Sequence, residues 1–230
     1  MILYRGPSMI DRNPIVAIAT GYNRPSKNTK TGAMVQVWIL REDIHPVGAV
    51  MEGSDKSICG SCRHRGPLGK RSCYVNVGKA PSNVWKSYQK GRYEVCPDLT
   101  AFGADKLLRL GAYGDPGAVP IKVWRDLTAR SKGWTGYTHL WQSKPHLKSM
   151  CMASVDTPNE HMVASMKGWR TFRVTSDMKT LDNEIMCPAS KEAGMRTTCQ
   201  MCKLCNGQKN DGRASIMIMV HGTGSKHYAE

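Results

Sequence analysis

Short apolar runs recur along the chain, and polar or turn-rich stretches separate each run from the next. Segment 15–20 (IVAIAT) is almost continuously apolar, and segment 33–40 (AMVQVWIL) combines β-branched residues with partial alternation. Both patterns are typical of β-strands. On the same grounds we predict further strands at 106–110, 136–141, 150–155, 169–175, 184–186 and 215–220.

Other stretches place apolar residues at helical spacing and predict helices at 81–93, 120–131 and 157–167. In the second of these, Ile121, Trp124 and Leu127 share one face. The third begins with the run Thr157-Pro158-Asn159-Glu160. This run is a helix start, because the Thr hydroxyl can cap the first turn, Pro suits the first position and Glu suits the third.

Strands that alternate with helices predict parallel βαβ units and therefore an α/β fold. Some of the connections are too short to contain a full helix. We therefore predict one domain, 1–230, built as a partial or degraded β/α barrel of roughly six to eight strands. The cysteine-rich loops are expected at the carboxyl-end face of this barrel.

The strongest chemical signal is the second cysteine loop, 187–207. Cys187 is followed by Cys199, Cys202 and Cys205, and the last three have the spacing C-x2-C-x2-C. Four thiolates at this spacing suit a [4Fe–4S] cluster or a tetrahedral Zn²⁺ ion. Three closely spaced cysteines with a more distant fourth, Cys187, which is followed by Pro188, favour an iron–sulfur cluster over zinc. The remaining alternative is that these four cysteines bind no metal.

The first cysteine loop, 57–75, offers three thiols, from Cys59, Cys62 and Cys73. A fourth ligand can come from Cys96, His64 or an exogenous group. Three thiolates on a cubane leave one iron open, which is chemically useful. The alternative is a zinc knuckle that includes His64 or Cys96.

Several polar or flexible residues follow predicted strands directly. At the carboxyl ends of parallel strands, such residues tend to line the functional site. The candidates for cofactor binding are Gly114, Asp115, Ser176 and Asp177, with His139 and Gln142 at the same edge. For the Gly114-Asp115 pair, the alternative is a tight turn that Asp115 caps.

The net charge is +15 and the pI is about 9.6, which favours an anionic partner such as nucleic acid, a polyphosphate or an acidic protein. The alternative is a basic surface that serves only solubility. The basic residues that we predict to bind phosphates are Lys27, Lys30, Arg63, Arg65, Lys70 and Arg71. Trp85 and Tyr88 can stack on bases, but their helical spacing favours core packing.

No apolar run reaches the roughly 18 residues that a membrane span requires. The amino-terminal residues lack the layout of a signal peptide. We therefore expect a cytoplasmic protein whose thiols are reduced, and nine cysteines in that compartment indicate metal ligation rather than disulfides.

Short motifs resemble two families. The run from Ser26 to Gly32 (SKNTKTG), the first cysteine loop ending in Cys73-Tyr74, the Gly114-Asp115-Pro116 turn and the second cysteine loop are similar to the phage "gene product 88" family. This resemblance implies an origin in a phage or mobile element and no particular activity.

The layout also resembles the radical SAM superfamily, whose members have a partial β/α barrel and a three-cysteine cluster loop. Their cluster motif is usually CxxxCxxC, whereas this chain has C-x2-C-x10-C. The resemblance implies that Cys59, Cys62 and Cys73 hold a cluster and that Asp115 contacts S-adenosylmethionine. The second cysteine loop would then hold an auxiliary cluster.

The leading hypothesis is a phage-type iron–sulfur protein with one or two [4Fe–4S] clusters, a radical-SAM-like architecture and a site of action on or near nucleic acid in the host cytoplasm. The sequence leaves open whether the protein is an enzyme. One alternative is a non-catalytic nucleic-acid-binding protein with structural zinc or [4Fe–4S] centres. Another is an inhibitor or regulator of a host protein.

Overall fold

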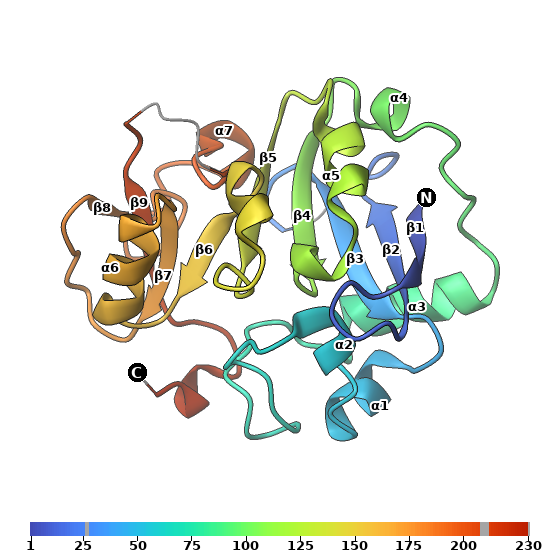
Figure 1. Ribbon diagram of the computed structural model, residues 1–230, viewed down its shortest axis with the longest axis horizontal. Helices are drawn as coiled ribbons and strands as arrows, with labels where there is room; N and C mark the ends of the chain where they lie inside the picture. The colour runs from blue at the N-terminus through green and yellow to red at the C-terminus, as the bar shows by residue number, and fades with distance from the viewer. Residues whose placement is uncertain (26–27, 208–211, 230) are drawn as a thin grey trace.

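The computed structural model describes residues 1–25, 28–207 and 212–229. Within these ranges, nine strands form one sheet (Figure 1). The strands are β1 (Ile2–Pro7), β2 (Pro14–Thr20), β3 (Val35–Arg41), β4 (Leu107–Tyr113), β5 (Gly133–Thr138), β6 (Met152–Val155), β7 (Thr171–Thr175), β8 (Glu184–Met186) and β9 (Ser215–Met219).

Short helices connect the strands. The α-helices are α1 (Pro46–Met51), α2 (Lys56–Cys59), α3 (Ala80–Gln89), α4 (Leu99–Gly103), α5 (Ile121–Thr128), α6 (Pro158–Met166) and α7 (Cys199–Cys202). Three 3₁₀ turns are η1 (Pro116–Ala118), η2 (Pro145–Ser149) and η3 (Ser225–His227).

The sheet has the order β1-β2-β3-β4-β5-β6-β7-β9-β8. The first three strands are antiparallel, and all pairings from β3 onward are parallel. In the described chain β1 and β8 are the two outer strands, so the sheet is open rather than closed. The predicted α/β class is confirmed, with a mostly parallel sheet.

The predicted number of strands was too low, because β1 was missed. Its sequence, ILYRGP, contains Gly and Pro and carries no clear alternation. Such a segment is compatible with a strand at the edge of a sheet, where a missing N–H donor costs little. Pairing with β2 makes it a strand, with a register shift between Ile2 and Tyr4.

The strand predicted at 136–141 lies three residues earlier, at Gly133–Thr138. Gly136 lies inside the strand, at a position where its neighbours leave no room for a side chain. A Cβ atom there would lie 3.0 Å from Cys151 Sγ and 3.2 Å from the Met150 carbonyl oxygen.

The main core lies between β1–β4 and the helices that cover them. On α5, Trp124 and Leu127 are fully buried and Ile121 is partly buried, as the helical spacing predicted. On α3, Trp85 and Tyr88 pack against the core, and the Trp85 indole donates a hydrogen bond to the Arg41 carbonyl oxygen. Core packing, rather than base stacking, is therefore the role of these two aromatic residues.

The predicted start of α6 is confirmed. The Thr157 hydroxyl accepts a hydrogen bond from the Glu160 backbone N–H, and Pro158 is the first helical residue. The Glu160 carboxylate accepts a hydrogen bond from the Asp156 backbone N–H. Both interactions fix the chain at the carboxyl end of β6, where Asp156 lies.

Candidate functional site

A cavity of about 420 Å³ lies against one face of the sheet. Alternate residues of the parallel strands point into it, because successive side chains of a strand lie on opposite faces. These residues are Arg109, Gly111 and Tyr113 of β4, Thr135 and Tyr137 of β5, Phe172 and Val174 of β7, and Ile216 and Ile218 of β9. The volume lies in the range of small-molecule sites, roughly 300–1,000 Å³.

The first cysteine loop closes one end of this cavity. The Asp115 backbone N–H, just beyond β4, donates a hydrogen bond to the Ile58 carbonyl oxygen at 2.6 Å, which ties the loop to the carboxyl ends of the strands. Cys59, Cys62 and Cys73 all line the cavity. Burial raises the pKa of Cys59 well above its usual value, that of Cys62 to about 12, and that of Cys73 as well.

The second cysteine loop closes the opposite side. Cys187, Cys199, Cys202 and Cys205 line the cavity too. The Cys199 N–H donates to the Lys30 carbonyl oxygen, and the Gly136 N–H donates to the Cys205 carbonyl oxygen, both at 2.8 Å. Lys30 precedes β3, so Cys199 lies near the amino end of that strand.

Cys199 therefore lies away from the carboxyl-end face, contrary to the sequence-based expectation, whereas Cys187 directly follows the carboxyl end of β8. Figure 1 shows α2 and α7 beyond opposite ends of the parallel strands. The predicted ligands nevertheless share one cavity, because it extends along the strands from one loop to the other.

All nine cysteines are free thiols. Among the described residues, no three cysteines bring their sulfur atoms within 4.8 Å of one another. A tetrahedral Zn²⁺ site with Zn–S bonds of about 2.3 Å places its sulfurs only about 3.8 Å apart. A four-iron cluster distributes its cysteine ligands over separate iron corners and so accommodates a wider spacing. Thiolate donors suit both iron–sulfur clusters and zinc ions.

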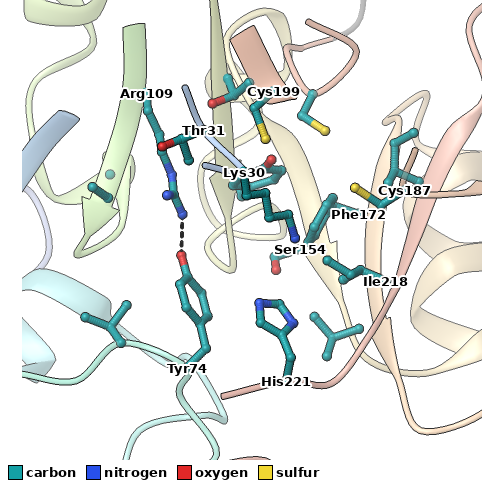
Figure 2. A pocket seen from close by; sticks show the side chains of 18 of the residues that line it. Lys30, Thr31, Tyr74, Arg109, Ser154, Phe172, Cys187, Cys199, Ile218 and His221 are labelled. Atoms are coloured by element: carbon teal, nitrogen blue, oxygen red, sulfur yellow. Dashed lines mark hydrogen bonds between the residues drawn. The ribbon is translucent and has the colours of Figure 1, made fainter. Parts of the chain in front are cut away.

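Cationic and aromatic side chains project into the cavity between the loops (Figure 2). The Arg109 guanidinium donates a hydrogen bond to the Tyr74 hydroxyl at 2.6 Å, and the Tyr74 ring stacks on the His221 ring with centroids 5.4 Å apart. Lys30 points into the same space below Cys199. Positive charge from Arg109 and Lys30 opposes the effect of burial on the pKa of Cys199, which is nevertheless raised.

No family model, curated protein or solved structure matches this chain. Within the described residues, no helix is both long enough and apolar enough to cross a membrane.

Asp115 lines the cavity, but protein groups already occupy both of its carboxylate oxygens. Oδ1 accepts hydrogen bonds from the Gly117 N–H and the Thr138 hydroxyl, and Oδ2 accepts one from the His139 N–H, all at 2.8 Å. Asp115 therefore caps η1 and joins β4 to β5, which was the alternative to cofactor binding. Burial raises its pKa.

Gly114 is required by the tight turn. Its φ is +82°, and a Cβ atom would lie 2.7 Å from Ile39 Cβ. The other two predicted cofactor residues, Ser176 and Asp177, are exposed beyond β7 and are not among the described residues that line the cavity.

The predicted phosphate-binding residues occupy several environments. Arg65 forms an ion pair with the buried Asp55 at 2.6 Å, and Arg71 is buried with its guanidinium against the Cys73 thiol. Arg63 donates to the Ala229 carbonyl oxygen, and Lys70 is exposed. Lys27 lies outside the described residues, and Lys30 lines the cavity. The five described residues do not form one continuous basic surface.

Sequence reasoning did not identify Arg109, Tyr74 and His221 as cavity residues. Arg109 had a detectable signal, because it is a charged residue inside an apolar strand and lies on the same face as Gly111. Tyr74 and His221 carried none, since their positions depend on loops that only the tertiary structure brings together.

The buried thiols give the metal-free protein a specific dependence on pH. When a pKa is higher in the folded state, the stability that it provides is lost as the pH rises from the unfolded pKa toward the folded one. For Cys62 and Cys205 this window runs from 9.0 to about 12. We expect each thiol to lower the free energy of unfolding by about 1 kcal/mol between about pH 8 and about pH 10.

Chemical denaturation of the metal-free chain at these two pH values measures the effect. The double variant Cys62→Ala/Cys205→Ala serves as the reference, because it keeps every other titrating group. Its loss of stability over the same interval should be smaller by about 2 kcal/mol. An equal loss in both proteins would contradict the assignment.

Proposed function

We propose that this protein is an iron–sulfur enzyme of the radical-SAM type, in which two cysteine loops hold [4Fe–4S] clusters at either end of a ligand cavity. One observation carries the proposal. Seven thiols from two loops more than 100 residues apart in the sequence line the same cavity. Seven thiolates are more ligands than one tetrahedral zinc ion takes, and they match one three-cysteine and one four-cysteine cluster.

The arrangement of the strands supports a partial β/α barrel. Parallel strands β3 to β7 are neighbours in sequence order, as in the wall of such a barrel, and the cavity lies against one face of the sheet. The open edges at β1 and β8 account for the incomplete closure.

In this proposal Cys59, Cys62 and Cys73 ligate the catalytic cluster, and the second cysteine loop ligates an auxiliary one. When bound there, such a cluster, with one iron free of cysteine, would pass an electron from an external reductant to S-adenosylmethionine for its reductive cleavage. The side chains of the cavity bind and orient the ligand.

The chain offers complementary groups for a ligand with an anionic end and an apolar body. Arg109 and Lys30 place positive charge in the cavity and can pair with a carboxylate or phosphate. Phe172 and Ile218 provide apolar walls that exclude water.

The net charge of +15 supports a site of action on or near nucleic acid. The resemblance to the phage "gene product 88" family supports a role in the cytoplasm of an infected host. Lys70 and Arg63 lie on the exposed first loop, next to the proposed catalytic cluster, and are the candidates for phosphate contacts there.

Anaerobic purification followed by iron, sulfide and zinc analysis tests the cluster assignment. We expect about eight iron atoms per chain for two clusters and a brown protein. The variants Cys59→Ala/Cys62→Ala and Cys199→Ala/Cys202→Ala should each lose about half of the iron. The matched control is Cys151→Ala, because Cys151 is buried in the core and is not a cavity residue. A colourless, zinc-loaded protein would refute the assignment.

Production of 5′-deoxyadenosine from S-adenosylmethionine under a strong reductant tests the enzymatic part. We expect the Cys59→Ala/Cys62→Ala variant to abolish it and Cys151→Ala to retain it.

The net charge also favours a second candidate, a non-catalytic nucleic-acid-binding protein whose metal centres only hold the loops. Intact clusters, no 5′-deoxyadenosine and DNA or RNA binding that weakens steeply with salt would support this candidate instead.

A further inference from the structure

Three side chains other than cysteines converge beside the first cysteine loop. His64 belongs to that loop, His139 follows β5 directly, and Asp156 follows β6 directly. Since β5 and β6 are parallel neighbours, residues that follow them meet at the same edge of the sheet. The Asp156 side chain is 2 % exposed and that of His64 is 10 % exposed.

Their ligand atoms have the spacing of a metal site. His64 Nε2 lies 2.8 Å from Asp156 Oδ1, and His139 Nε2 lies 3.8 Å from Asp156 Oδ2. All three ligand atoms lie within 4.8 Å of one another, which holds for no other group of His, Cys, Asp or Glu in the described chain. Metal–ligand bonds of about 2.0–2.2 Å place neighbouring ligand atoms roughly 3–3.5 Å apart, so only small shifts are needed.

Neighbouring groups hold the ligands in orientation. The Ser72 hydroxyl lies 2.8 Å from His64 Nδ1, which leaves Nε2 directed at Asp156. The Tyr228 ring stacks on the His64 ring, and the Tyr228 hydroxyl donates to the Val174 carbonyl oxygen at 2.6 Å and lies 3.2 Å from the Asp156 carbonyl oxygen. Hydrogen bonds to the second nitrogen of a ligating histidine are a regular feature of metal sites.

Two features are unexplained without a cation. His139 Nε2 is buried and has no hydrogen-bond partner in the part of the chain that the structure describes. The ion pairs of the buried Asp156 in the same residues are with His64 and His139, and none is with Lys or Arg. A divalent cation would accept the free lone pair of His139 and compensate the carboxylate charge.

We infer that His64, His139 and Asp156 bind one divalent transition-metal ion. Two histidines and one carboxylate are a common ligand set for catalytic zinc and for non-haem ferrous iron. Both His64 and His139 line the large cavity, so a remaining coordination position faces the ligand space. This site is separate from the proposed cysteine ligands and adds a mononuclear metal to the same cavity.

The same atoms also form a Ser72–His64–Asp156 chain that resembles a hydrolytic triad. In such a triad the serine bonds to Nε2 and the carboxylate to Nδ1 of the histidine. Here the two nitrogens are exchanged, with Ser72 at Nδ1 and Asp156 at Nε2. A triad also leaves His139 Nε2 unexplained, so the metal site is the better assignment.

Cobalt binding to the full-length chain tests the inference. The chain is loaded anaerobically with iron and sulfide and desalted, and Co²⁺ is then added while bound metal and the visible spectrum are recorded. Wild type should bind one more equivalent of Co²⁺ than His139→Ala or Asp156→Asn. The difference spectrum should show cobalt with nitrogen and oxygen ligands, without thiolate charge transfer. The comparison does not depend on how full the cysteine sites are, because wild type and variants share them.

His146→Ala is the matched control, because His146 is an exposed histidine in η2 and does not line the cavity. It should keep the extra equivalent, and iron content should be equal in all four proteins. Circular dichroism identifies a variant that fails to fold, and His139→Gln then replaces it. Equal Co²⁺ binding by wild type and both site variants would overturn the inference, as would an equal loss in His146→Ala. Labelling of Ser72 by a fluorophosphonate without any difference in Co²⁺ binding would assign the same atoms to a hydrolytic triad.

Discussion

Replacing Arg173 with Met should lower the free energy of unfolding by about 3–5 kcal/mol. Arg173 lies on β7 and reaches across β9 to Glu184 on β8, with Nε–Oε1 at 3.0 Å and Nη2–Oε2 at 2.9 Å. Both side chains are buried, with 4 % and 0 % exposed. Removing the guanidinium therefore leaves a buried carboxylate without its main partner, which is the costly way to break an ion pair.

The double variant Arg173→Met/Glu184→Leu separates the ion pair from simple packing. It removes both charges, so its loss of stability should be clearly smaller than that of Arg173→Met alone. Chemical denaturation of the metal-free proteins measures both. A double variant as unstable as the single variant would show that the stranded carboxylate is not the cause.

This ion pair also bears on the candidate site. Glu184 begins β8, and Cys187 follows that strand directly. The Leu181 N–H also donates a hydrogen bond to the Glu184 carboxylate, which fixes the start of β8. We therefore expect Arg173→Met to weaken metal loading of the second cysteine loop more than that of the first.

Replacing Trp124 with Ala should also lower the free energy of unfolding by about 3–5 kcal/mol. The side chain is fully buried on α5 in the main core, and its indole N–H donates to the Pro116 carbonyl oxygen at 2.8 Å. The substitution leaves a large cavity. It also removes the indole N–H that bonds to the Pro116 carbonyl oxygen in the Asp115-Pro116 turn. A thermal or chemical denaturation experiment measures the loss.

Trp124→Phe is the control, since it keeps most of the apolar volume and removes the hydrogen-bond donor. It should cost less than Trp124→Ala, with about 1–3 kcal/mol for the unpaired carbonyl oxygen in addition to a smaller packing loss. If Trp124→Ala cost less than about 1 kcal/mol, α5 would not be anchored to the core by this residue.

The candidate site was predictable in its ligand types but not in its geometry. The spacing of Cys199, Cys202 and Cys205 marks a ligand set by itself, because thiols a few residues apart can reach one centre. We expected these cysteines to lie close to Cys59 and Cys62 because both loops were placed at one edge of the sheet. In the structure the two groups line the same cavity from opposite ends of the strands. His64, His139 and Asp156 carry no joint signal, because 75 or more residues separate His64 from the other two.

The sequence by itself determined eight of the nine described strands, the three longest helices and the start of α6, because hydrophobic periodicity and helix caps act between residues that are close along the chain. The short helices α1, α2, α4 and α7 were missed, since four to six residues are too few to show a helical period. It also determined the α/β class, since strands that alternate with helices favour parallel pairing. Only the tertiary structure decided the order of the nine strands, the burial of Arg71 beside Cys73 and the position of the second cysteine loop near the amino end of β3. These features depend on which distant segments pack together, and the free energy of such contacts is not encoded in any local pattern.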